Sequence, residues 1–164
     1  MAHDKPMRMN VRSPDLFLVR ELGHLEFNRR VLALAEDRRV PPLERLRYLC
    51  IVDSNLDEYF EIRVAGLKER IAANAPPGPD GMPPKQVFHK VVRRTRDIVG
   101  RLYEVLNDEV LPQLAAEGIR ILRRTKWNPR QQAWLRDYFF RELMPVLTPI
   151  GLDPSHPFPR LLNK

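Results

Sequence analysis

The stretch LDEYFEIRVAGLKERI, residues 56–71, decides the class of fold that this sequence predicts. Its apolar residues advance in steps of four, four, three and four: Leu56, Phe60, Val64, Leu67 and Ile71. This spacing places them on one stripe of an α-helix, whereas a half-buried strand would alternate at every second residue. The stretch therefore predicts an amphipathic helix with one buried face.

Three similar stripes lie on either side of this stretch. They comprise Leu22, Leu25, Val31, Leu32 and Ala35; then Leu43, Leu46, Leu49 and Cys50; and finally Val87, Val91, Ile98, Leu102 and Val105, with Thr95 filling the gap. Each stripe has the period of a helix that packs one face on a core. Residues 15–118 therefore predict a helical bundle built from four amphipathic helices.

Proline residues mark where these predicted helices end. The chain has 16 prolines, and proline inside a helix removes a hydrogen bond and clashes with the preceding turn. Five of them, with two glycines, fall in PPGPDGMPP, residues 76–84. This segment predicts an exposed, semi-rigid loop that separates two antiparallel helix pairs or the halves of one bundle. We expect residues 1–14 to form a disordered tail.

The pattern changes after Gly118, which is typical of a helix C-cap. Residues 119–122 begin with alternation and predict a strand, and Asn128 followed by Pro129 predicts the start of a helix that ends near Leu143. The proline-rich residues 145–159 are expected to be extended. We therefore expect a mainly α chain in which residues 119–164 open a second, α/β domain that is incomplete here.

Composition excludes several classes of protein. No unbroken apolar run exceeds the five residues 48–52 in length, which is far short of the ~20 residues of a transmembrane helix, and no apolar segment of a secretory signal is present. The single cysteine, Cys50, excludes a disulfide framework and favours a cytoplasmic protein.

The common catalytic motifs are absent from the sequence. It contains no phosphate-binding loop, dinucleotide-binding glycine pattern, nucleophile elbow or close pair of metal-ligating cysteines or histidines. The four histidines, His3, His24, His89 and His156, lie far apart. Spacing therefore predicts no catalytic residue and no metal ligand in this chain.

The net charge of +7 is unevenly distributed. Residues 15–75 hold ten basic and eleven acidic side chains, whereas residues 85–126 hold ten basic and five acidic ones. One interpretation is a solvated helix face. The other is a positive field that attracts polyanions such as polyphosphate, ATP or RNA.

The triplet Asp53, Ser54 and Asn55 disfavours a helix interior. Ser54 with Asp57 three residues later is similar to a capping box, so a helix is expected to begin here after a tight joint. Asn55 then serves the helix end or points toward a ligand, since an amide offers the donor and acceptor that suit the edge of a nucleobase. In the ligand case, Asn55→Ala is expected to weaken ligand binding and leave stability nearly unchanged.

Three segments together resemble the amino-terminal part of the polyphosphate kinase family: RELGHLEFNRRVL (20–32), PLERLRYLCIVDSNLDEYFEIRVAGLK (42–68) and PVLTPIGLDPSHPFP (145–159). SNLDE with RVAGL, and DPSHPFP, are two independent matches. The sequence departs from the family pattern at Gly23 and His24, where serine and tryptophan are usual, and at Arg160, where an aromatic residue is common. We interpret His24 as a packing or surface replacement rather than a ligand.

The resemblance implies a function for the parent enzyme. The family reversibly transfers the terminal phosphate of ATP to polyphosphate through a phosphohistidine, with Mg²⁺, in carboxy-terminal domains that follow a helical amino-terminal domain and a head domain. No catalytic residue or metal ligand of the family maps onto this chain, so the chain alone is expected to be inactive. Asn55 is the one ATP-binding residue that maps here, on the adenine side.

The resemblance also implies partners and a location. These are ATP, polyphosphate and, in the parent enzyme, a homo-oligomer to which this segment supplies structural or dimer contacts. The location is cytoplasmic, with membrane association of the parent enzyme as an alternative. Two rival hypotheses stay open, a basic helical module that binds nucleic acid or protein without catalysis and a structural or dimerising domain without a ligand. No specific nucleic acid is expected, because no basic stripe is interleaved with aromatic residues.

Overall fold

The computed structural model describes residues 10–11, 13–155 and 157–159. It divides the chain into two compact units, Met1–Gly118 and Ile119–Lys164. Residues 1–9 and 12 of the expected tail lie outside the described residues, as do His156 and residues 160–164.

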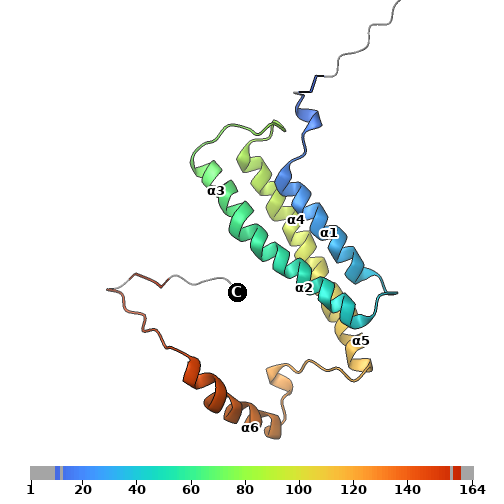
Figure 1. Ribbon diagram of the computed structural model, residues 1–164, viewed down its shortest axis with the longest axis vertical. Helices are drawn as coiled ribbons and strands as arrows, with labels where there is room; N and C mark the ends of the chain where they lie inside the picture. Colours follow the sequence, from blue (N-terminus) through green and yellow to red (C-terminus); the bar gives the residue numbers. More distant parts are fainter. Residues whose placement is uncertain (1–9, 12, 156, 160–164) are drawn as a thin grey trace, which may run out of the picture. The chain divides into compact units, whose positions relative to one another are not determined.

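Among the described residues, the first unit is built from three long helices (Figure 1). They are α1 (Arg20–Glu36); α2 (Pro42–Glu58) with the π-helical turn η2 (Tyr59–Val64) and α3 (Ala65–Ala72); and α4 (Pro84–Glu104) with the π-helical turn η3 (Val105–Val110) and α5 (Leu111–Ala116). The backbone stays right-handed helical at each junction, so each composite helix is continuous. A short 3₁₀ turn, η1 (Pro14–Leu16), precedes them. The prediction of a mainly α fold is confirmed.

The predicted helix start at Ser54 is wrong, because α2 runs through this position without a break. Leu49, Val52 and Leu56 are buried at steps of three and four residues, so the buried stripe continues across the polar triplet. Asp53 and Ser54 point to solvent, where their weak helix propensity is easily outweighed by packing on the opposite face. The expected helices with stripes at residues 43–50 and 56–71 therefore form one continuous helix.

The π-helical turns explain two further differences from the sequence prediction, one in the buried face near residue 60 and one in the helix end expected at Pro112. Phe60, predicted on the buried stripe, is 41% exposed, and Tyr59 is buried in its place at 3%. A π-helical turn widens the helix and rotates the residues that follow it, which shifts the buried face. Pro112 was expected to end a helix, yet the helix continues through it directly after η3.

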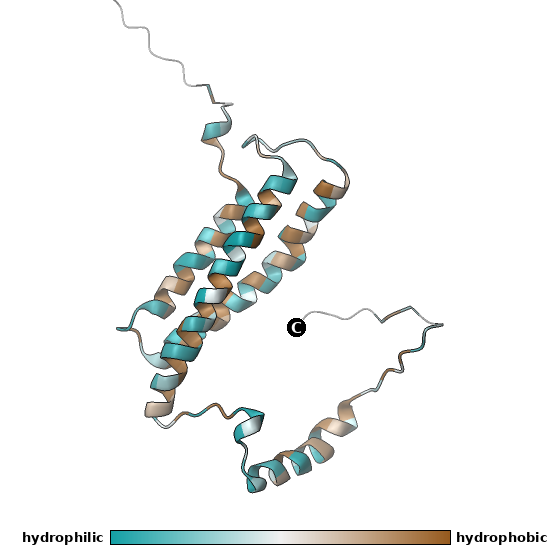
Figure 2. Cartoon of the chain, turned by 180° about the vertical axis from the view of Figure 1, so that it is seen from behind, coloured by the Kyte–Doolittle hydropathy of each residue, from teal (hydrophilic) through white to brown (hydrophobic). Residues whose placement is uncertain are grey.

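The core of the bundle draws on all three helices. It consists of Val19, Leu22, Leu25, Leu32 and Ala35; Leu49, Val52, Leu56, Tyr59, Val64 and Leu67; and Val87, Val91, Ile98, Leu102, Val105, Val110 and Leu114. Figure 2 shows hydrophobic (brown) and hydrophilic (teal) residues recurring along each of these helices, as expected of helices that bury one face. Residues 76–83 of the expected loop belong to the connection between α3 and α4, whereas Pro84 is buried as the first residue of α4.

A fully buried arginine joins the three helices at one end of the bundle. Arg45 of α2 donates from Nε to the Ala35 carbonyl at 2.6 Å, from Nη1 to Gln113 Oε1 at 2.8 Å and from Nη2 to Glu109 Oε2 at 2.7 Å. Ala35 lies in the last turn of α1, where backbone carbonyls lack helical partners. These bonds fix where α1 ends relative to α2, and so help set the pairing of residues between the two helices.

The second unit has one regular helix among its described residues, α6 (Pro129–Tyr138), which continues through the π-helical turn η5 (Phe139–Leu143). The predicted cap is confirmed, since Asn128 and Gln131 form a capping box with both bonds at 2.9 Å. The strand expected at residues 119–122 is not formed. A strand needs a neighbour that accepts its ladder hydrogen bonds, and the described residues contain no second strand. Two 3₁₀ turns, η4 (Arg124–Lys126) and η6 (Met144–Val146), complete the unit.

Candidate functional site

Asn55 lies on the wall of a pocket of about 160 Å³ between α1 and the α2–η2 helix. The pocket is lined by His24, Phe27 and Asn28 of α1 and by Asn55, Glu58, Tyr59, Ile62 and Arg63 of the second helix. Within each helix these positions are three or four residues apart, so they share a face. The turn after α1 brings the two faces together.

Two apolar side chains stand exposed at this pocket. Phe27 is 56% exposed and Ile62 is 55% exposed. They face solvent next to the polar group of Asn55 and the opposite charges of Glu58 and Arg63. An apolar surface with a few polar groups at its edge suits a flat ligand that has apolar faces and a polar rim.

A chain of hydrogen bonds holds Asn55 in place. Its Nδ2 donates to Asn28 Oδ1 at 2.9 Å, and Asn28 Nδ2 donates in turn to the His24 carbonyl at 3.1 Å. Asn28 is only 1% exposed, whereas Asn55 is half-buried at the pocket. A carboxamide has two N–H donors and one acceptor oxygen, and the bond to Asn28 uses a single donor of Asn55.

Tyr59 forms a fixed, neutral part of the pocket lining. Its hydroxyl donates to the Glu21 carbonyl at 3.1 Å, and burial, with a smaller contribution from the Glu21 charge, raises the pKa of Tyr59 far above its usual value. The His24 ring stacks on the Tyr59 ring with centroids 6.2 Å apart. His24 thus packs against an aromatic residue, in line with its interpretation as a packing replacement.

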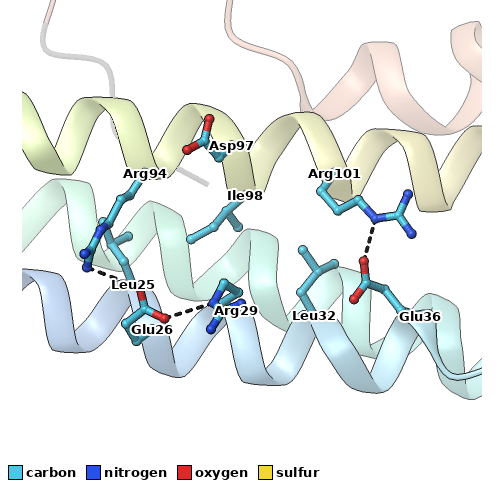
Figure 3. Close-up of a pocket in the computed structure, with 9 residues that line it drawn as sticks. All are labelled: Leu25, Glu26, Arg29, Leu32, Glu36, Arg94, Asp97, Ile98 and Arg101. Carbon is cyan, nitrogen blue, oxygen red and sulfur yellow. Dashed lines mark hydrogen bonds and ion pairs between the residues drawn. The ribbon is translucent and has the colours of Figure 1, made fainter.

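A second, larger groove of about 380 Å³ runs between α1 and α4 (Figure 3). Its charged lining residues are Arg29, Arg94 and Arg101 together with Glu26, Glu36 and Asp97. Glu26 accepts from Arg29 at 2.9 Å and pairs with Arg94 at 3.2 Å, and Glu36 accepts from Arg101 at 2.5 Å. Since three positive and three negative charges balance, this groove has no excess charge with which to attract an anion.

Two family models match the chain. The model described as "Polyphosphate kinase N-terminal domain" matches residues 17–122, and the one described as "Polyphosphate kinase middle domain" matches residues 130–164. The chain belongs to the polyphosphate kinase family. The resemblance found in the sequence is thereby confirmed.

Individual relatives agree with this assignment. The polyphosphate kinase of Paraburkholderia phytofirmans is 56% identical over 159 residues, which cover 95% of this chain and 23% of the relative, and that of Burkholderia cenocepacia is 55% identical over the same length. The crystal structure of polyphosphate kinase from Porphyromonas gingivalis matches with a TM-score of 0.71 at 31% identity, over 88% of this chain and 21% of that one. The chain thus spans less than a quarter of the length of the curated relatives that it matches.

The positive charge of this polyphosphate kinase family member lies mostly outside the bundle. Met1–Gly118 holds nineteen basic and eighteen acidic residues, whereas Ile119–Lys164 holds nine basic and three acidic ones. The basic excess counted over residues 85–126 therefore straddles two units. Within the bundle, Arg94 and Arg101 are neutralised by glutamates of α1, which favours the solvated-face interpretation for α4.

Among the described residues, no three histidine, cysteine, aspartate or glutamate side chains gather closely enough to hold a metal ion. In the same part of the chain, no helix combines the length and the apolar character needed to cross a membrane.

Sequence reasoning identified Asn55 but missed the residue that holds it. Asn28 stands three residues after Leu25 and four before Leu32, so it occupies a position of the buried stripe of α1. A polar residue at a buried stripe position needs a hydrogen-bond partner, and that signal was available in the sequence. Arg45, four residues before Leu49 on the stripe of α2, shows the same signal.

Proposed function

We propose that this chain is the amino-terminal part of a polyphosphate kinase that reversibly transfers the terminal phosphate of ATP to polyphosphate. Within that enzyme, the pocket at Asn55 forms the adenine-side wall of the ATP site. One observation carries the proposal: Asn55 of the SNLDE motif lies in a pocket between two helices, next to exposed apolar side chains, with its amide held by a buried partner.

The chemistry of adenine matches this arrangement. The base is flat, has apolar faces and carries its hydrogen-bonding groups on the rim. Phe27 and Ile62 offer apolar surface to a face of the base, and the Asn55 amide meets its edge. Arg63 and Glu58 line the same pocket with opposite charges, so this wall meets the base and not the phosphates of ATP.

Phosphoryl transfer itself is assigned to parts of the enzyme outside this chain. The proposal places the Mg²⁺ site in those parts as well, and among the described residues no three potential metal ligands gather. The role proposed for the chain is to bind and orient the nucleoside end of ATP. The same proposal includes a cytoplasmic, homo-oligomeric enzyme, with polyphosphate as the second substrate.

The test is Asn55→Ala in the full-length kinase. Loss of a neutral hydrogen bond weakens binding by about 0.5–1.5 kcal/mol, so the KM for ATP should rise roughly two- to twelve-fold while the KM for polyphosphate stays unchanged. The matched control is Asn107→Ala. Asn107 is an exposed asparagine of η3 whose Nδ2 donates to the Tyr103 carbonyl of its own helix. An unchanged KM for ATP in a folded Asn55→Ala enzyme would overturn the proposal.

A further inference from the structure

We infer that Asn28 is a positioning residue that fixes which way round the Asn55 carboxamide faces, and that this orientation makes the site select adenine over bases with an oxygen at position 6. The inference rests on the proposed function, since it concerns how Asn55 meets the base. The comparisons with relatives assign no role to Asn28, whose side chain lies beneath the pocket surface at 1% exposure.

The first link is the orientation of Asn28. Its Nδ2 lies 3.1 Å from the His24 carbonyl oxygen, which can only accept a hydrogen bond. The nitrogen of the Asn28 amide must therefore face His24, and its oxygen must face the other way, toward Asn55. Reversing this buried amide would set two oxygens against each other without solvent to separate them.

The second link transfers that orientation to Asn55. Asn28 Oδ1 accepts from Asn55 Nδ2 at 2.9 Å. With the Asn28 oxygen fixed as an acceptor, Asn55 must present its nitrogen to it, because a reversed Asn55 would bring two acceptor oxygens to hydrogen-bond distance. The Oδ1 atom of Asn55 is consequently directed away from Asn28. Since Asn55 lines the pocket, we infer that this oxygen is the atom that it offers to a ligand there.

The third link is the complementarity with the base. Adenine carries an amino group at position 6, a donor that the Asn55 oxygen can accept. The remaining N–H of Asn55 can donate to a ring nitrogen, which is the pairing that asparagine makes with adenine in DNA. Guanine and hypoxanthine carry an oxygen at position 6, which would face the Asn55 oxygen without a proton between them. A freely rotating amide would serve both kinds of base, and so the bond from Asn28 creates the preference.

The experiment measures kcat/KM for ATP and for inosine triphosphate, which differs from ATP only in the substituent at position 6 and the proton on the ring. It uses the full-length kinase and two variants, Asn28→Ala and Asn28→Asp. Both variants lose the amide N–H that donates to the His24 carbonyl, and aspartate in addition sets an oxygen against that carbonyl, so it is the more disruptive change of the two. Only aspartate keeps an oxygen that accepts from Asn55 Nδ2, so it is the matched control for orientation.

We expect the wild-type enzyme to prefer ATP over inosine triphosphate. Asn28→Ala should lower this preference roughly two- to twelve-fold, the value of one hydrogen bond, whereas Asn28→Asp should keep it. An equal loss in both variants would overturn the inference, because it would show a merely structural role. So would a wild-type enzyme without any preference, a result that needs no variant to fold.

The outcomes also separate this inference from the proposal on which it rests. If Asn55→Ala leaves the KM for ATP unchanged, the proposed contact itself is wrong. If Asn55→Ala raises that KM while Asn28→Ala keeps the preference for ATP, Asn55 contacts the base but Asn28 does not orient it, and only the present inference falls.

Discussion

Replacing Glu109 by leucine should destabilise the bundle more than replacing the arginine that it neutralises. The Arg45 side chain is 0% exposed and its Nη2 lies 2.7 Å from Glu109 Oε2, whose side chain is 18% exposed. Glu109→Leu leaves a guanidinium buried without its counter-charge, which costs about 3–5 kcal/mol. That is a large share of the ~5–15 kcal/mol that stabilises a typical domain.

Arg45→Met should cost less, because the carboxylate left behind is not isolated. Glu109 keeps Arg38 at 3.5 Å and Arg101 at 3.7 Å, and part of it reaches solvent. The loss then comes mainly from the buried Ala35 carbonyl, which loses its donor at about 1–3 kcal/mol, because the half-buried Gln113 amide can bond to water instead. The double variant Arg45→Met/Glu109→Leu has neither charge, so it should be more stable than Glu109→Leu alone.

The assay is urea unfolding of the four proteins at neutral pH, followed by far-ultraviolet circular dichroism. The four free energies of unfolding form a double-mutant cycle with an expected coupling energy of about 3 kcal/mol. Additive losses in the double variant, or a loss below about 1 kcal/mol for Glu109→Leu, would refute the view that a buried charge pair holds this end of the bundle.

Three further predictions follow from the structure. Hydrogen bonding from Arg45, together with the charges of Arg38 and Arg45, lowers the pKa of Glu109. The stabilisation that the Glu109 carboxylate gives the fold is therefore complete above the pKa of unfolded glutamate, about 4.3, and is lost as the pH falls through the lower pKa of the folded state. The difference in melting temperature between wild type and Glu109→Gln should shrink in acid, and a constant difference would contradict this. Thr95→Val should raise the free energy of unfolding by about 1 kcal/mol in urea titrations, because the buried Thr95 hydroxyl has no hydrogen-bond partner among the described residues; a loss of stability would speak against it. Backbone amides of residues 119–155 should exchange hydrogen faster than those of α1, α2 and α4, because the described residues of the second unit contribute nothing to the buried core. Equal protection in both units would show that the second unit packs as tightly as the bundle.

The bundle could be predicted well because burial imposes a spacing that the sequence displays. Leu25 and Leu32, or Val91 and Ile98, lie seven residues apart on one helical face, and only a helix brings both to a core. The prediction failed where it trusted local preference over packing. Asp53 and Ser54 favour a helix end in isolation, yet Val52 and Leu56 are buried on either side of them and keep the helix intact.

The candidate site was less predictable, because its interactions join residues far apart in the sequence. Asn55 was found through a family resemblance, and its partner Asn28 lies 27 positions earlier on another helix. This bond also changes one expectation. Asn55→Ala was expected to leave stability nearly unchanged, but it removes the donor from a buried Asn28 oxygen, and a loss of about 1–3 kcal/mol is now expected.

The most direct test of the central claim is a crystal structure of the full-length kinase with a non-hydrolysable ATP analogue. The account predicts that the adenine ring occupies the pocket between α1 and α2, in contact with Phe27 and Ile62, with its 6-amino group within hydrogen-bond distance of Asn55 Oδ1. An adenine ring bound elsewhere, with this pocket still empty, would contradict it.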